Sequence, residues 1–178
     1  MRFRYLAVGV LSFALAFVSV SVAQQDKSAR PSPPGTAEVT LKGKKITIEY
    51  SRPSMKGRKI MGGLVPYGKV WRTGANEATT LTTEADLNIG GTDVPAGKYT
   101  LYTLPSEESW KLIINKQTGQ WGTVYDQGKD LARVDLKKSS LNQPVEQLTI
   151  SFKKTNDSTA DLVIQWETTE LSVPVKAK

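Results

Sequence analysis

Short segments in which apolar and polar residues alternate recur along most of this chain, and glycine or proline separates many of them. In residues 45–50, for example, Ile46, Ile48 and Tyr50 fall on one face of an extended chain, and polar residues fall on the other. A period of two predicts a β-strand with one buried face. The expected strands are residues 37–41, 45–50, 79–83, 87–89, 98–104, 110–115, 132–137, 145–153, 159–168 and 171–175.

No segment of helical length shows the 3.6-residue period of an amphipathic helix. Many short strands with glycine and proline at the turns are typical of all-β sandwiches and jelly rolls. A chain of 178 residues has room for one ordinary domain and a processing segment. We therefore predict a single-domain antiparallel β-sandwich, jelly-roll-like, over residues 37–176, with two long irregular loops.

The N-terminus has the pattern of a secretory signal peptide in residues 1–23. Arg2 and Arg4 precede an apolar run from Leu6 to Val20, and Ala23 ends a small-x-small cleavage site. The run is shorter than the roughly 20 apolar residues that span a bilayer. We expect cleavage, no stable membrane anchor afterwards, and an exported protein that is periplasmic or secreted. Residues 24–36 are polar and carry three prolines, which predicts a flexible lead-in to the domain.

The sequence contains neither cysteine nor histidine. Their absence excludes serine–histidine and cysteine–histidine catalysis, and zinc sites built on cysteine or histidine. No acid-rich loop of the calcium-binding kind is present either. We expect no metal and no cofactor, and any catalysis would depend on carboxylates, lysine or tyrosine.

Basic residues exceed acidic ones by seven in the whole chain, and by five once Arg2 and Arg4 leave with the signal peptide. In an exported protein this modest excess does not indicate a nucleic-acid partner. Anionic glycans, envelope surfaces or simply a solvated basic surface would account for it. Nothing in the sequence specifies an oligomeric state.

The segment 51–80 matches neither the helical nor the strand period, although it is rich in arginine and aromatic residues. Irregular segments of this kind are usually held by a scaffold and carry recognition or chemistry. Arginine can grip a carboxylate, sulfate or phosphate, and loop aromatics can stack on rings. With the second irregular stretch, 116–131, it supplies these candidate ligand contacts: Arg52, Arg58, Tyr67, Trp71, Arg72, Asn76, Glu77 and Trp121.

A structural reading competes with each of these candidates. The arginines could be solvated or paired with Glu77, Asp126 or Asp130, and the loop aromatics could plug the ends of the sandwich. Trp110 and Trp166, which lie on expected strands, are assigned to the core. The weak candidates for catalysis are Glu77 and Asp126, because a carboxylate pair can cleave a glycosidic bond when its members lie about 5–10 Å apart.

Several motifs surround these residues: Tyr50-Ser51-Arg52-Pro53, Lys56-Gly57-Arg58, Leu64-Val65-Pro66-Tyr67-Gly68, the run from Val70 to Thr79, Pro95-Ala96-Gly97, Tyr99, Trp110, Trp121-Gly122, Tyr125-Asp126, Asp130 and Arg133-Val134. Together they resemble the motifs of a bacterial family known as domain of unknown function 2911. The resemblance covers roughly residues 30–175. It implies an exported β-rich domain without an established activity, and it transfers no catalytic role.

Three functional hypotheses follow. The leading one is a binding module for a small polar or anionic, glycan-like ligand, with its site between the two irregular loops. The alternatives are a carboxylate-dependent hydrolase of envelope carbohydrate and a purely structural or protein-interaction domain. On this reasoning the protein is more readily a binder than an enzyme.

Overall fold

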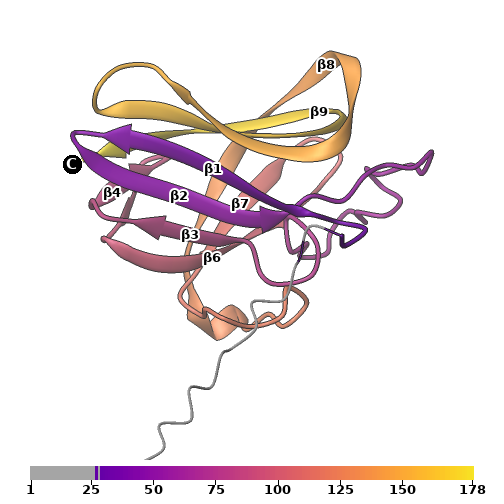
Figure 1. Cartoon of the computed structure of the whole chain (residues 1–178), viewed down its shortest axis with the longest axis horizontal. Helices are drawn as coiled ribbons and strands as arrows, with labels where there is room; N and C mark the ends of the chain where they lie inside the picture. Colours follow the sequence, from indigo (N-terminus) through magenta and orange to yellow (C-terminus); the bar gives the residue numbers. More distant parts are fainter. Residues whose placement is uncertain (1–26, 28) are drawn as a thin grey trace, which may run out of the picture.

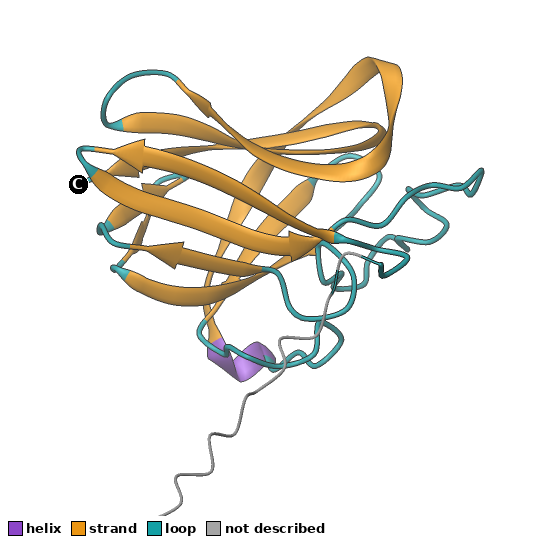
Figure 2. Cartoon of the chain, in the orientation of Figure 1, coloured by secondary structure: helices purple, strands orange, loops and turns teal. Residues whose placement is uncertain are grey.

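The structure is a computed structural model that describes residue 27 and residues 29–178. The predicted signal peptide, residues 1–23, lies outside the described residues, as does most of residues 24–28. Strands make up most of the fold, and the helical structure in the described part is a single 3₁₀ turn (Figure 2). The elements are β1 (Pro34–Leu41), β2 (Lys44–Ser51), β3 (Thr80–Thr83), β4 (Leu87–Ile89), β5 (Thr92–Val94), β6 (Gly97–Leu104), β7 (Trp110–Asn115), η1 (Gln127–Lys129), β8 (Asp130–Lys154) and β9 (Thr159–Ala177).

All nine strands belong to one antiparallel sheet with the order β1-β2-β3-β6-β7-β8-β9-β4-β5. The prediction of a single all-β domain with two long irregular loops is confirmed. The strands are nevertheless joined into one sheet, and two separately bonded sheets of a sandwich are not formed. The reason lies in β8, whose first residues pair with β7 while residues 137–154 pair with β9.

The sheet folds over itself, so that β8 and β9 lie across β1 and β2 (Figure 1). Hydrogen bonds close the fold directly. The Tyr50 hydroxyl accepts from the Ile150 amide at 2.9 Å, and the Lys42 amide donates to the Asp157 carbonyl at 2.8 Å. No helix in the described part of the chain is long and apolar enough to cross a membrane.

The core fills the space between the folded layers with the apolar faces that alternation predicts. Ile46 and Ile48 of β2 are fully buried, as are Leu112 and Ile114 of β7. The assignment of Trp110 and Trp166 to the core is confirmed, because each is only 1% exposed. β1 begins at Pro34, three residues before the expected start of the domain.

Strand β9 is one strand where two were expected, and a local irregularity explains the difference. Even-numbered residues from Ala160 to Trp166 are buried, whereas odd-numbered residues are buried from Thr169 to Ala177. Glu167, between the two sets, has a φ of 54° and lies where the register with β8 shifts. Such a bulge changes which side chains face the core without ending the strand.

Candidate functional site

The irregular segment 51–80 connects β2 to β3, and hydrogen bonds hold it against β8 and β9. The Glu146 carbonyl of β8 accepts from the Met55 amide at 2.8 Å, and its carboxylate accepts from the Lys56 amide at 2.9 Å. The Glu167 carboxylate accepts from the amides of Ile60 and Met61, both at 3.2 Å. The bulge in β9 therefore places a carboxylate where it satisfies two backbone donors of the loop.

The later part of the segment is bonded to β6. Trp71 and Thr103 exchange backbone hydrogen bonds of 2.8 and 2.9 Å. The segment then meets the second irregular stretch, because the Gly122 amide donates to the Asn76 carbonyl at 2.9 Å and Glu77 forms an isolated bridge with Trp121. The two irregular loops thus lie together at one end of the sheet.

Between these loops lies a cleft of about 330 Å³. Its lining combines two arginines and two tryptophans with small residues of both loops, and no lining residue is acidic. The lining residues are Ser32, Pro53, Arg58, Leu64, Trp71, Arg72, Gly74, Ala75, Gly122, Thr123 and Trp166. Three predicted contacts, Arg58, Trp71 and Arg72, therefore share the cleft. The other five candidates do not line it.

Arg72 is held in a defined position in the cleft. Its Nε donates to the Gly74 carbonyl at 3.2 Å, and its stem packs on Gly122, where a Cβ would come within 2.8 Å of the Arg72 Cδ. No acceptor among the described residues bonds its two terminal nitrogens, and no described carboxylate forms an ion pair with it. The terminal N–H groups can thus donate hydrogen bonds to an anion.

The two remaining arginine candidates are largely used by the protein itself. Arg58 donates from Nε to the Met55 carbonyl at 2.9 Å and from a terminal nitrogen to the Ser54 carbonyl at 2.7 Å, which fixes its own loop. Arg52 instead bonds the Leu148 carbonyl at 3.2 Å and the Thr149 hydroxyl at 3.1 Å on β8. Arg58 therefore contributes positive charge to the cleft, whereas Arg52 ties the end of β2 to β8.

The aromatic candidates separate in the same way. Trp71 stacks on Trp166 with ring centroids 5.8 Å apart and an interplanar angle of 19°, and both rings line the cleft. Tyr67 is half-buried and covers Gly62, where a Cβ would lie 2.9 Å from the Tyr67 ring. Trp121 is 50% exposed and stands outside the cleft. Among the aromatic candidates, only Trp71 lines the cleft, and it does so together with Trp166.

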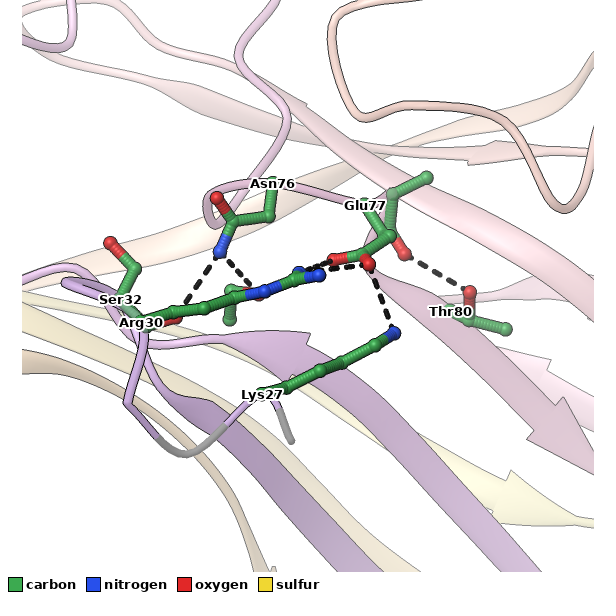
Figure 3. Close-up of polar contacts among 8 residues, drawn as sticks. Lys27, Arg30, Ser32, Asn76, Glu77 and Thr80 are labelled. Carbon is green, nitrogen blue, oxygen red and sulfur yellow. Dashed lines mark hydrogen bonds and ion pairs between the residues drawn. The ribbon is translucent and has the colours of Figure 1, made fainter. Parts of the chain in front are cut away.

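Glu77 and Asn76 do not line the cleft, and they bind the segment that precedes β1 (Figure 3). The Glu77 carboxylate lies 2.9 Å from Lys27 Nζ and 2.9 Å from an Arg30 terminal nitrogen. The hydrogen bond from Lys27, with those from the Glu77 backbone and Arg30, lowers the pKa of the Glu77 carboxyl from 4.5 to about 2. Glu77 is therefore ionised at every physiological pH.

Asp126 is bonded to a different part of the chain from Glu77. Its carboxylate caps η1 by accepting from the Gly128 amide at 2.9 Å, and it is exposed. Beside it, the Tyr125 hydroxyl donates to Asp130 at 2.7 Å and accepts from Arg133 at 2.9 Å. Burial and the bond to Asp130 raise the pKa of Tyr125. Each group is used to hold the second irregular loop.

The chemistry of the cleft favours an anion over a cation. Within residues 27 and 29–178, acidic side chains form no group of three or more that could hold a metal ion. Hard cations need several carboxylate or carbonyl oxygens, and the cleft offers guanidinium groups instead. A carboxylate, sulfate or phosphate joined to an apolar or ring-shaped part would match this lining.

Several important residues give no clear signal in the sequence. Trp166 lies on a strand in which apolar and polar residues alternate, and this pattern predicts a core residue. The pattern gives no sign that Trp166 also lines the cleft. Glu146 and Glu167 look like ordinary surface acids of β8 and β9. Gly122 belongs to the Trp121-Gly122 motif, but the sequence does not show that it packs against Arg72.

Comparisons with known proteins give one match. The family described as "Protein of unknown function (DUF2911)" matches residues 32–175 of the 178. No curated protein and no solved structure matches the chain. The matched region includes all nine strands except the last two residues of β9, and it includes both irregular loops. The chain belongs to the DUF2911 family.

Proposed function

We propose that this protein is an exported binding module whose cleft takes a small anionic ligand. The observation that carries the proposal is Arg72, which is fixed at Nε and along its stem while its terminal nitrogens bond no acceptor among the described residues. A cation that is already ordered loses little further freedom when it binds, which favours affinity. The cleft is at the lower end of the size range of small-molecule sites, so the ligand has the size of one sugar ring.

The remaining lining supports the same ligand class. Arg58 adds a second positive charge, and the stacked pair of Trp71 and Trp166 offers an apolar wall to the rest of the ligand. Because no acid lines the cleft, an anion meets no like charge there. A uronic acid or a sulfated or phosphorylated sugar combines a ring with such an anion.

A hydrolase built on Glu77 and Asp126 has less support. A general acid must hold a proton near the working pH, and the Glu77 carboxyl, with a pKa of about 2, does not. Its oxygens are also engaged by Lys27 and Arg30, while the Asp126 carboxylate caps η1. Binding without hydrolysis is therefore the function we propose.

Titration calorimetry with glucuronate and glucose tests the proposal, because these sugars differ by one carboxylate. We expect the mature protein to bind glucuronate and not glucose, and the affinity to fall as salt rises. Arg72→Ala should weaken glucuronate binding about 10–100-fold, the usual effect of losing a charge-assisted hydrogen-bonded pair. The matched control is Lys98→Ala, which removes one exposed positive charge on β6, outside the cleft.

Equal binding of the two sugars, or unchanged affinity in Arg72→Ala, would contradict the proposal. If neither sugar binds, the same comparison is made with sulfate and inorganic phosphate, which present the anion alone. Binding of none of these four probes would overturn the assignment of the cleft as an anion site. Native mass spectrometry of the protein purified from its host then shows whether any other small molecule is retained.

A further inference from the structure

The short segment before β1, residues 29–33, contributes to one wall of the cleft through Ser32, and we call this segment the strap. Ser32, in the middle of the strap, is a lining residue. The C-terminal end of the strap is anchored, because the Pro33 carbonyl accepts from the Arg52 amide at 2.8 Å and β1 begins at the next residue. Within the described residues, a backbone hydrogen bond therefore attaches the strap to the sheet at its C-terminal end.

The rest of the strap is attached through polar contacts with Asn76 and Glu77 (Figure 3). The Asn76 side-chain amide donates to the Ser32 carbonyl at 3.2 Å. Arg30 donates to both Glu77 carboxylate oxygens at 2.9 Å, and Lys27 adds a further ion pair of 2.9 Å to the same carboxylate. One acid thus holds two cations of the preceding chain.

The strap has no apolar anchor of its own. None of residues 29–33 is buried, and the Glu77 side chain is 41% exposed. Ion pairs at such exposure contribute little free energy and are screened by salt. Segments with few buried apolar contacts also open at low free-energy cost while the remaining fold stays intact.

We propose that the strap is a movable wall of the cleft, which Glu77 holds in the closed position. In the closed position the wall would retain an anion that Arg72 binds. Only this part of the inference rests on the proposed function. Glu77 is then a positioning residue: it does not line the cleft and acts on it through Arg30 and Ser32. Because Arg72 is fixed and the strap is weakly held, the ligand would enter the cleft from the side of the strap.

A single introduced thiol can measure the opening, because the chain contains no cysteine. Ser32→Cys places the thiol in the strap, and its rate of alkylation by neutral iodoacetamide reports how often the wall opens. Adding Glu77→Gln should raise this rate about three- to tenfold, the range expected for losing two exposed ion pairs. Raising the salt concentration should accelerate labelling while Glu77 is present and have a smaller effect in the double variant.

The matched control is Glu38→Gln in the same Ser32→Cys background. Glu38 forms a comparably exposed ion pair with Lys45, at 2.8 Å, on β1 and β2. We expect this variant to leave the labelling rate within twofold. If Glu77→Gln also left the labelling rate within twofold, the inference would be overturned. The same would follow if Glu77→Gln and Glu38→Gln raised the labelling rate by the same factor.

The ligand measurement separates this inference from the proposed function. Glucuronate should slow labelling in the Ser32→Cys protein, and it should dissociate faster from Glu77→Gln than from the wild type. Faster labelling with an unchanged dissociation rate would overturn the role of the strap as a wall, while leaving the anion site in place. If glucuronate, sulfate and phosphate all fail to bind, the proposed function fails, and the ligand-free labelling rates still decide whether Glu77 holds the strap.

Discussion

Two charged clusters lie within six residues of each other in the segment 51–80, and they differ in how their charges are used. At Glu77, two cations surround one carboxylate, and the carboxylate is fully engaged. At Arg72, the guanidinium bonds one backbone carbonyl, and no acid lines the surrounding cleft. The first cluster is complete within the protein, whereas the second leaves donors available to a ligand.

This difference shows that the residue types in a motif do not by themselves distinguish residues that stabilise the fold from residues that could bind a ligand. The run Arg72-Thr73-Gly74-Ala75-Asn76-Glu77 has the composition of one polar site. Positive φ angles at Thr73 and Asn76, 53° and 59°, turn the chain within this run. As a result Arg72 lines the cleft, while Asn76 and Glu77 face the strap.

The largest expected effect is on the unfolding free energy, from a substitution in the cleft that Arg72 lines. Trp166→Ala removes a ring that is 1% exposed and takes away the stacking partner of Trp71. We expect the free energy of unfolding in urea to fall by about 3–5 kcal/mol. Trp121→Ala, at a ring that is 50% exposed, should change it by less than about 0.5 kcal/mol. Similar losses in the two variants would show that Trp166 is not part of the core.

An intermediate effect is expected at Gly122, which lies against both Arg72 and the Asn76 carbonyl. A Cβ at this position would lie 2.8 Å from Arg72 Cδ and 2.9 Å from the Asn76 carbonyl oxygen. Gly122→Ala should therefore cost about 1–3 kcal/mol of unfolding free energy and weaken anion binding, because the Arg72 stem must move. Gly128→Ala is the control in the same loop: its Cβ would meet only the Asp126 carboxylate, at 3.1 Å. Wild-type anion affinity in Gly122→Ala would argue against a fixed Arg72.

The smallest effect is expected from the acid titration of Glu77. Its pKa is about 2 in the folded protein and 4.5 without its partners, so its contribution to stability is complete above about pH 4.5. That contribution declines as the pH falls and is lost as the pH passes through about 2. Because the ion pairs are partly exposed, the contribution should stay below about 1 kcal/mol.

The measurement is the difference in unfolding free energy between the wild type and Glu77→Gln, followed by chemical denaturation at several pH values. Using the difference removes the titration of other carboxyls, including that of Glu170, whose pKa is lowered mainly by its hydrogen bond from Gln165. We expect the difference to shrink between pH 4.5 and the lowest accessible pH. A difference that grows on acidification would show that Glu77 is not stabilised as a carboxylate.

The strands could be predicted from the sequence because burial of one face imposes a period of two. Residues 44–51 illustrate this, since the alternating apolar residues Ile46, Ile48 and Tyr50 are those that the structure buries. The continuity of β8 and β9 could not be predicted in this way. A bulge at Glu167 changes the buried face without ending the strand, and periodicity interprets such a change as a break.

The candidate site was predicted less completely, for a different physical reason. The types of residue in segment 51–80 indicate possible contacts, but the bonds that occupy Arg52 and Glu77 depend on partners far along the chain. Arg52, for example, bonds Leu148, which is 96 residues away. Only the fold decides that the terminal nitrogens of Arg72 bond no acceptor among the described residues, and the sequence does not encode that locally.

The folding of the sheet over itself has a consequence for the order in which the molecule assembles. The β8–β9 hairpin joins neighbouring parts of the chain, whereas the bond between Tyr50 and Ile150 spans 100 residues. Contacts between distant residues carry the greater chain-entropy cost and slow folding. The cleft, with Ser32 and Trp166 in its walls, therefore depends on the slowest class of contact. In refolding experiments the fluorescence change from Trp71 stacking on Trp166 should therefore accompany the final phase.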